Sequence, residues 1–516
     1  MRSVLGSNNI DTAARYGHMN SVLAMQHALG VGRSTTSYEK ITLSDVNFLI
    51  GTNITETNPI ASLRVKKAKT HFDAKIIVAD TWETKMMKLA THPLQMAPLA
   101  EGLFIQGLVK AVLDKGLVHP PVAAEYGSAI EALREGVAGL SERVIGERSG
   151  VPWDKISEAA ELLANAKRGT IIWGEGIVSQ KGGYENALRL IDLALITGLL
   201  EKEGAGLQPI CEENNEQGAV DMGGVPEFLP GQIPFASPSA RQHFSSEWHA
   251  ALPDPAAGRP GLTLPEMIAA ANRGEIKALY VVGENPLGSL PASMKVQEAL
   301  DKIDLIICQD PFMTETGEMA DYLLPAATFA EKEGTFTNMA GEVNRVSEAF
   351  DPRGEARPDW KIFSELSKHL GQPLLYKGPE EIYQEIAKMV PGYFRGERPP
   401  VQIDPYLNQG FLSGVAGRYG IPSSEEAPTA GEGVPFFLSR EQVIYHSGKL
   451  STRDSGLMKI YDKPTLQIGT ADAEALQLET GNLVKIKSPL GSMEVPVEVV
   501  PSLPRGLVQF PEHFNQ

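Results

Sequence analysis

Val46-Asn47-Phe48-Leu49-Ile50-Gly51 is a short apolar run that ends in glycine, and Ala74-Lys75-Ile76-Ile77-Val78-Ala79-Asp80 repeats the pattern further along the chain. The segment between them, roughly Ala61 to His71, has helical period, so this stretch predicts a strand, a crossing helix and a parallel strand. A helix over Trp153 to Ala166 and a strand at Thr170-Ile171-Ile172-Trp173-Gly174 extend the series. Such alternation is typical of a doubly wound α/β domain with helices on both faces of a parallel sheet.

The same alternation returns in the second half of the chain. Helices near Leu264 to Asn272 and near Lys295 to Lys302 alternate with strands at 278–283 and 305–310. We therefore predict a second αβα domain. Both domains are expected to be related to dinucleotide-binding folds.

The C-terminal part has a different pattern. Residues 378–435 are rich in Pro, Gly and Glu apart from a helical piece near Glu380 to Met389, and we interpret them as a linker. Beyond it, strands at 465–468, 483–487 and 493–499, a turn at Ser488-Pro489-Leu490-Gly491 and a short helix over 471–476 predict a small β-barrel. The predicted domains are thus 1–213, 214–377 and 436–516, joined by the linker 378–435.

Composition excludes several classes of function. The net charge is −17, from 64 acidic and 47 basic residues without a polybasic run, which argues against binding nucleic acid or anionic lipid. Cys211 and Cys308 are the only cysteines, so we expect no iron-sulfur cluster within this chain and a reducing cytoplasm. No apolar run reaches the ~20 residues of a membrane helix, so attachment to the inner face of a membrane would require partner subunits.

Polar loops follow the predicted strands, where open α/β sheets bind their ligands. After the first strand, Gly51 precedes Asn53, Glu56 and Thr57, whose amide, carboxylate and hydroxyl groups can hold phosphate or sugar oxygens, although a helix cap uses the same residue types. Asp80 ends the second strand, where a carboxylate can accept ribose hydroxyls or cap a helix.

Further strands end in the same way: Gly174-Glu175-Gly176 follows the third strand, and Gly283-Glu284-Asn285-Pro286 and Gln309-Asp310 end strands of the second domain. Together these ends favour a long, polar, nucleotide-like ligand.

The segment Glu212 to Gly223 packs amides, carboxylates and glycines into a stretch too polar for a core. Asn214-Asn215-Glu216-Gln217-Gly218-Ala219, with Asp221-Met222-Gly223 and Leu229-Pro230-Gly231, closely resembles a motif of the molybdopterin guanine dinucleotide oxidoreductases, and the formate dehydrogenase branch is nearest. Supporting matches, in order along the chain, are Gly283-Glu284-Asn285-Pro286-Leu287, 309–316, Ala320-Asp321, Leu324-Pro325, 333–338 and Pro358-Asp359-Trp360.

The resemblance implies one pterin dinucleotide in each α/β domain, a molybdenum or tungsten ion, and a C-terminal barrel over both. It places one guanosine at Asn53, Glu56, Thr57 and Asp80, the other at Asp310 and Thr314, and a pterin near Glu213 and Gly218. Other expected cofactor-binding positions are Gly51, Gly174, Gly176, Asn215, Gly283, Asn285, Gln309 and His446.

The departures from the family pattern concern catalysis. Formate dehydrogenases of this family ligate the metal through a cysteine or selenocysteine just before a histidine, and Arg15-Tyr16-Gly17-His18 aligns with that stretch. Glycine has no side chain, so we expect no metal ligand from position 17. His18 is the candidate catalytic residue, although a lone histidine near a helix start is more often a structural hydrogen-bonding group.

Other substitutions affect substrate and phosphate binding. The arginine expected to clamp formate falls at Cys211, so formate oxidation is not expected. A Gly-Thr-Asp phosphate loop appears as Leu99-Ala100-Glu101, and Glu213 stands where the formate enzymes have an amide. Leucine cannot replace glycine where backbone must approach a ligand closely.

Two hypotheses follow. The chain resembles the C-terminal portion of the G subunit of respiratory NADH:quinone oxidoreductase, which implies electron transfer with iron-sulfur and flavin partner subunits, with or without bound cofactor. The alternative is either an active molybdenum or tungsten oxidoreductase on a small substrate, in a formate dehydrogenase-like complex, or a noncatalytic structural subunit that no longer binds the cofactor. The family's N-terminal iron-sulfur segment has no counterpart here, so we expect either a separate subunit or a partial gene product.

Overall fold

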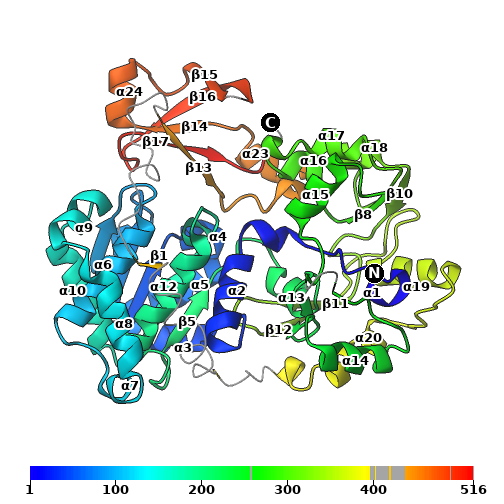
Figure 1. The fold of residues 1–516 in the computed structure, drawn as a ribbon. Coiled ribbons are helices and arrows are strands. Elements are labelled where there is room, and N and C mark those ends of the chain that lie inside the picture. Colours follow the sequence, from blue (N-terminus) through cyan, green and yellow to red (C-terminus); the bar gives the residue numbers. More distant parts are fainter. Residues whose placement is uncertain (256–258, 396–400, 402–417, 420–435, 489, 515–516) are drawn as a thin grey trace. The chain divides into compact units, whose positions relative to one another are not determined.

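The computed structural model describes residues 1–255, 259–395, 401, 418–419, 436–488 and 490–514. The chain divides into two compact units, each built from two separate segments (Figure 1). Unit 1 contains Met1–Tyr16 and Asn214–Arg398, and unit 2 contains Gly17–Glu213 and Pro399–Gln516.

Unit 2 contains a five-stranded parallel sheet in the order β3-β2-β1-β4-β5. The strands are β1 (Val46–Ile50), β2 (Lys75–Asp80), β3 (His92–Gln95), β4 (Gly169–Trp173) and β5 (Gly206–Pro209). Every residue of β1 and β4 is buried, as expected for a sheet covered on both faces.

The helices of unit 2 pack on this sheet around a core that includes Phe48, Phe104 and Trp173, each fully buried. The indole of Trp173 donates to Ser21 Oγ at 2.9 Å. The helices are α2 (Met19–Leu29), α3 (Tyr38–Leu43), α4 (Ile54–Thr57), α5 (Pro59–Phe72), α6 (Glu101–Asp114), α7 (Pro120–Glu125), α8 (Gly127–Ala138), α9 (Glu142–Ser149), α10 (Trp153–Asn165), α11 (Glu175–Val178) and α12 (Gly183–Ile196).

The C-terminal part of unit 2 is a mixed five-stranded sheet in the order β13-β17-β14-β16-β15. The strands are β13 (Phe437–Glu441), β14 (Leu466–Gly469), β15 (Leu483–Ser488), β16 (Gly491–Val500) and β17 (Leu507–Pro511), with the helices α23 (Leu457–Ile460) and α24 (Thr470–Leu476). Ser488 pairs with Gly491 across the predicted hairpin turn, whose Pro489 lies outside the described residues. Ile468, Val495 and Val497 belong to the hydrophobic core of this C-terminal sheet.

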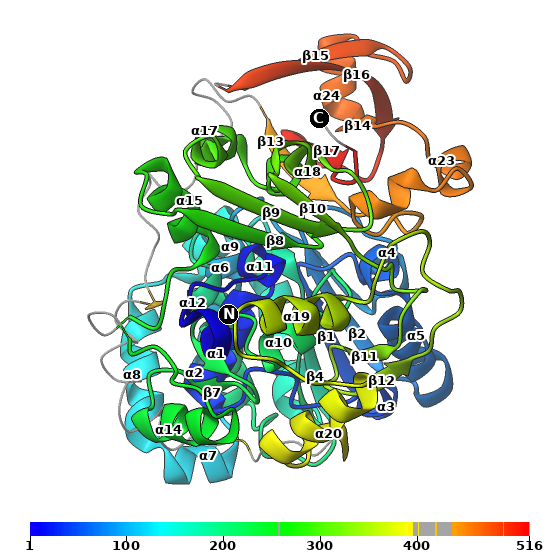
Figure 2. The same cartoon turned by 90° about the vertical axis from the view of Figure 1, so that its right-hand side faces the viewer.

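Unit 1 contains a three-stranded parallel sheet in the order β10-β9-β8, seen side by side in Figure 2. Its strands are β8 (Ala278–Val282), β9 (Leu305–Asp310) and β10 (Tyr322–Pro325), and two hairpins pair β6 (Phe228–Leu229) with β7 (Ile233–Pro234) and β11 (Gly334–Thr337) with β12 (Val343–Val346). Its helices are α1 (Arg2–Leu5), α13 (Glu216–Asp221), α14 (Pro238–Glu247), α15 (Leu264–Asn272), α16 (Pro286–Ser289), α17 (Val296–Leu300), α18 (Glu315–Met319), α19 (Asp359–His369) and α20 (Pro379–Met389).

The first sixteen residues belong to unit 1, whereas the sequence analysis grouped them with the first α/β domain. Arg2 is buried and donates to the carbonyls of Gly223, Val225 and Phe228 at 2.6, 2.7 and 3.0 Å. Arg15 forms an ion pair with Glu227 at 2.8 Å. Hydrogen bonds between residues more than two hundred positions apart leave no local trace in a sequence.

The α/β class and a C-terminal β domain were predicted correctly. The predicted strands and helices are present with ends shifted by a residue or two, and the helix expected over 295–302 is confined to α17. The helical piece of the expected linker is α20, and most of the remaining linker lies outside the described residues. Within the described ranges, no helix has the length and hydrophobicity required to cross a membrane.

Candidate functional site

The predicted glycines of unit 2 lie where the loops after β1 and β4 meet. A Cβ at Gly174 or Gly176 would lie 2.9 or 2.8 Å from the carbonyl oxygen of Gly51, which accepts from the Gly176 amide at 3.2 Å. Gly51 itself has φ +56. These glycines therefore allow the two loops to contact each other closely. Their predicted role in cofactor binding stays a prediction.

The loop after β1 is also tied to the C-terminal sheet of the same unit. Glu56 accepts from the backbone amide of Ile444 at 2.9 Å and forms an ion pair with Lys85. The amide of Asn53 donates to Glu441 at 3.5 Å, and Thr57 donates to the side chain of Asn58 at 2.8 Å. The polar groups expected to hold guanosine are thus engaged within unit 2.

Carboxylates gather in this part of unit 2; we call Asp80, Glu101, Glu175, Glu212, Glu441 and Glu512 the acidic cluster. Burial first, and the charge of neighbouring carboxylates second, raise the pKa of Glu175 to about 7 and that of Glu441 to about 8. Burial also raises the pKa of Asp80 to about 7. Arg440 opposes the shifts of Glu175 and Glu212. The cluster favours protons, donors or cations over anions.

The glycine at the expected metal-ligand position lies directly against one of these carboxylates. A Cβ at Gly17 would overlap Oε1 of Glu175, and Oε2 would lie only 3.1 Å away. His18 follows, fully buried, and precedes α2. The carboxylate of Glu175 therefore occupies the space in which a side chain at position 17 would begin.

The loop expected to be an altered phosphate loop has a backbone conformation that suits glycine. Leu99 has φ +63, a conformation that glycine adopts without strain, and its side chain is 45% exposed. Glu101 is buried in the first turn of α6, and burial raises its pKa. The carboxylate of Glu101 therefore lies at the N-terminus of α6, where a phosphate would be expected to bind.

The remaining predicted positions of unit 2 also have structural contacts. Cys211 is buried, and its carbonyl oxygen accepts from Asn58 at 3.1 Å. The carboxylate of Glu213 lies 3.8 Å from where a Cβ would stand at Gly448. His446 is buried, with Nε2 2.9 Å from the carbonyl of Tyr461 and Nδ1 3.1 Å from Ser451 Oγ.

In unit 1 the motif around α13 is held by a buried polar network. Asp221 accepts from Gln217 at 2.8 Å, Gln232 at 2.7 Å and Tyr393 at 3.1 Å. The hydroxyls of Tyr393 and Thr337 are 2.7 Å apart. Gln232, Thr337 and Tyr393 were not predicted as site residues, although Thr337 lies in the quoted segment 333–338. The contacts of Asn215 with Thr337 and of Asp221 with Tyr393 join segments that are distant in the sequence.

Asn215 and Gly218 form the start of this motif. Asn215 has φ +65, and its side-chain oxygen accepts from the Thr337 amide at 2.9 Å. A side chain at Gly218 would overlap that same oxygen. The motif therefore has a structural requirement for its amide and glycine.

The predicted residues at β8 and β9 do lie at one end of the unit 1 sheet. Gly283 has φ +60, and its amide donates to the Gln309 carbonyl at 2.8 Å. Asn285 accepts from the Thr316 hydroxyl at 2.8 Å, Asp310 accepts from the Phe312 amide at 2.8 Å, and Thr314 caps α18. Local hydrogen bonds thus fix the shape of this end of the sheet.

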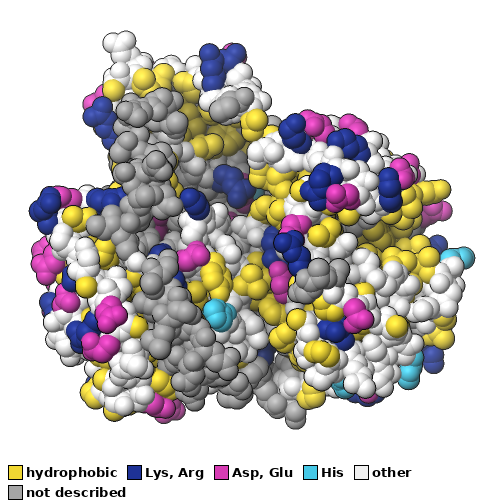
Figure 3. All heavy atoms as spheres, viewed as in Figure 1, with side chains coloured by type: hydrophobic (Ala, Val, Ile, Leu, Met, Phe, Trp, Pro, Cys, Tyr) yellow, Lys and Arg dark blue, Asp and Glu magenta, His cyan; other side chains and the backbone are white. Residues whose placement is uncertain are grey.

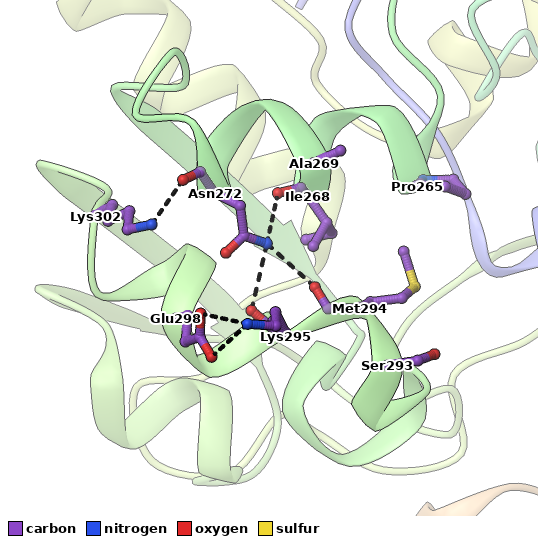
Figure 4. A pocket seen from close by; sticks show the side chains of 9 residues that line it. All are labelled: Pro265, Ile268, Ala269, Asn272, Ser293, Met294, Lys295, Glu298 and Lys302. Carbon is purple, nitrogen blue, oxygen red and sulfur yellow. Dashed lines mark hydrogen bonds and ion pairs between the residues drawn. The ribbon is translucent and has the colours of Figure 1, made fainter. Parts of the chain in front are cut away.

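A groove of about 520 Å³ on unit 1 lies between α15 and α17 (Figure 4). Lys295 forms an ion pair with Glu298 at 3.2 Å, and Lys302 donates to the carbonyl of Asn272 at 2.7 Å. Lys295 and Glu298 pair with each other, Lys302 has a backbone partner, and the groove contains none of the predicted site residues. On the face in Figure 3, described basic and acidic side chains are intermingled without a continuous basic patch.

Two parallel sheets with polar loops at their strand ends, and a C-terminal β domain, define an α/β protein of the nucleotide-cofactor class. Residues 1–369 match the molybdopterin oxidoreductase family model, and residues 439–516 match the molybdopterin dinucleotide binding domain. The chain belongs to the molybdopterin oxidoreductase family, as the sequence motifs predicted.

Individual relatives agree with this assignment. The chain is 33% identical to the F420-dependent formate dehydrogenase subunit alpha of Methanocaldococcus jannaschii, over 99% of this chain and 78% of the relative. It is 30% identical to the NADPH-Fe(3+) oxidoreductase subunit alpha of Geobacter sulfurreducens, over 100% of this chain and 59% of the relative. The acetylene hydratase of Pelobacter acetylenicus has the same fold, with a TM-score of 0.78 at 18% identity over 99% of this chain and 76% of that one.

The two matched domains imply a molybdopterin cofactor. Among the described residues, no group of three or more His, Cys, Asp or Glu side chains is placed to hold a metal ion by itself. Where such a cofactor binds, a donor from the chain would help to hold its metal. The residues at Gly17 fit such a group, because the glycine leaves a cradle that a carboxylate oxygen fills.

Proposed function

We propose that this chain is an electron-transfer subunit of a multi-subunit oxidoreductase, of the kind represented by the G subunit of respiratory NADH dehydrogenases. Two relatives bear names of subunits, and one of these names refers to NADPH and Fe(3+). Two cysteines cannot hold a four-thiolate cluster, so iron-sulfur and flavin partner subunits would carry electrons to and from this chain.

The observation that carries this proposal is the contact of Gly17 with Glu175. A thiolate cannot begin at position 17, and the acidic cluster around Glu175 repels an anion such as formate. Cys211 adds no positive charge at the place expected for an arginine. Formate oxidation is therefore not the activity that we propose.

Where the cofactor is bound, it would supply a redox-active metal. Loops at the ends of β1, β2 and β4 in unit 2, and at the ends of β8 and β9 in unit 1, would each hold a pterin dinucleotide. Asn53 and Asp80 in unit 2, and Asp310 in unit 1, offer groups that can bind a guanosine. The half-buried acids Glu175, Glu212 and Glu441 would hold protons near this site.

A second candidate function is an active molybdenum or tungsten oxidoreductase that uses an oxygen donor from the protein. The placement of the Glu175 carboxylate favours it. The small substrate of such an enzyme would be neutral or cationic, because the surrounding carboxylates disfavour anions.

Purification of the tagged chain from its native host tests the proposal. Iron, flavin, molybdenum, tungsten and acid-released GMP are measured in the purified material and normalised to the chain. We expect stoichiometric iron and flavin from copurifying subunits. A chain that purifies alone would contradict the subunit role, and metal with GMP in that solitary chain would support the second candidate.

A further inference from the structure

Gly17 and Glu175 form a matched pair within unit 2. Gly17 directly precedes His18 and α2, whereas Glu175 is the first residue of α11, two positions after β4. A Cβ at Gly17 would overlap Oε1 of Glu175, lie 2.6 Å from Cδ and lie 3.1 Å from Oε2. Any residue larger than glycine at position 17 would therefore displace this carboxylate.

One hydrogen bond holds the carboxylate in this place, and close backbone packing fixes the residue that bears it. The hydroxyl of Ser179, one turn later on α11, donates to Oε2 at 3.3 Å. Gly174 and Gly176 on either side of it have no room for side chains, because the carbonyl oxygen of Gly51 lies within 2.9 Å of either Cβ position. The backbone on both sides of Glu175 therefore packs closely against the loop after β1.

The chemistry of this placement differs from that of a thiolate. A carboxylate oxygen is a hard donor that suits a high-valent metal, whereas cysteine sulfur is soft. Arg440 is the cation whose charge acts on Glu175, whereas Glu512 and Glu213 repel it. A bound metal cation would relieve this repulsion.

Resting on the proposed binding of the pterin cofactor, we propose that Glu175 is the protein's donor to the pterin-bound metal, with its carboxylate oxygen at the place where a side chain at position 17 would begin. Glycine at position 17 leaves the space that this carboxylate occupies.

The test uses the complex purified from its native host, with Glu175→Gln and with Glu203→Gln as a matched control on the exposed surface of the same unit. X-ray absorption at the molybdenum or tungsten edge reports the atoms bound to the metal, and the ratio of metal to released GMP reports retention. In Glu175→Gln we expect the metal-to-GMP ratio to fall by at least about tenfold at unchanged GMP, because loss of a ligand weakens metal binding. Glu203→Gln should match the wild type.

A double variant distinguishes the loss of a metal ligand from a folding defect. Gly17→Cys combined with Glu175→Ala should restore metal retention and add a sulfur atom to the metal's coordination shell. Unchanged retention and an unchanged spectrum in Glu175→Gln would overturn the inference, as would wild-type protein that contains GMP but no metal. Copurifying iron and flavin are scored separately, so the subunit proposal can fail or stand independently of Glu175.

Discussion

Leu99 adopts a backbone conformation that suits glycine better than leucine. Its φ of +63 costs a side chain about 1 kcal/mol relative to glycine. We expect Leu99→Gly to raise the free energy of unfolding by about that amount, measured by urea denaturation. Leu89→Gly, at a similarly exposed leucine without positive φ, should instead lower it. A loss of stability in Leu99→Gly would show that the leucine side chain itself is required.

Glu441 makes unit 2 sensitive to pH. Its pKa is raised to about 8 in the folded protein, so the folded state binds a proton that the unfolded chain releases at a lower pH. Stability is therefore fully present below about pH 4.5 and is lost as the pH rises toward 8. Allowing for its partial exposure, we expect a loss on the order of 2 kcal/mol between pH 5 and 8.5.

Thermal unfolding across this pH range measures the effect. Glu441→Gln, which remains neutral, should flatten the dependence, whereas Glu203→Gln should leave it intact. An equally steep pH dependence in Glu441→Gln would assign the effect to other members of the acidic cluster.

At the scale of elements, the Asp221 network joins α13 to β11 and to the segment after α20. Tyr393 is buried and bonds both Asp221 and Thr337. Tyr393→Phe should lower the stability of unit 1 by about 1–2 kcal/mol, because it leaves buried oxygens without a donor. Tyr383→Phe, whose ring stacks on Phe394, is the control and should have a smaller effect. Equal effects of both changes on the unfolding free energy would contradict a role for the network.

The strands of the sheets could be predicted because β1, β2, β4, β8 and β9 are continuous apolar runs flanked by helical period. The short strands β3 and β5 were missed, since each contains a proline and lies at an edge of its sheet. The sequence predicted that polar residues follow the predicted strands, but it did not predict which residues they would contact. Glu56 with Ile444 and Asp221 with Tyr393 are separated by 388 and 172 residues, and spacing alone carries no such information. The acidic cluster was missed for the same reason.

At the scale of the whole molecule, Arg2 connects residues 1–16 to the rest of unit 1 by hydrogen bonds. Its guanidinium donates to three backbone carbonyls, and hydrogen bonds from a charged group are worth about 1.5–3 kcal/mol. Arg2→Ala should therefore destabilise unit 1 by about 3 kcal/mol or more. Hydrogen exchange followed by mass spectrometry should show faster exchange at 214–395 and unchanged protection in β1 and β4. Arg33→Ala in unit 2 is the control. Uniform loss of protection in both units would contradict separate stability.

Along the chain the two units alternate: residues 1–16 and 214–398 form one, and 17–213 and 399–516 form the other. During synthesis, the opening residues leave the ribosome almost two hundred positions before the segment that they stabilise, so unit 1 must wait while most of unit 2 is made. A gene fragment that ends at any of the three internal boundaries would therefore encode an incomplete unit. Dissection of this protein by truncation should yield aggregation, whereas insertion of a protease site at a boundary should leave nicked halves that remain folded.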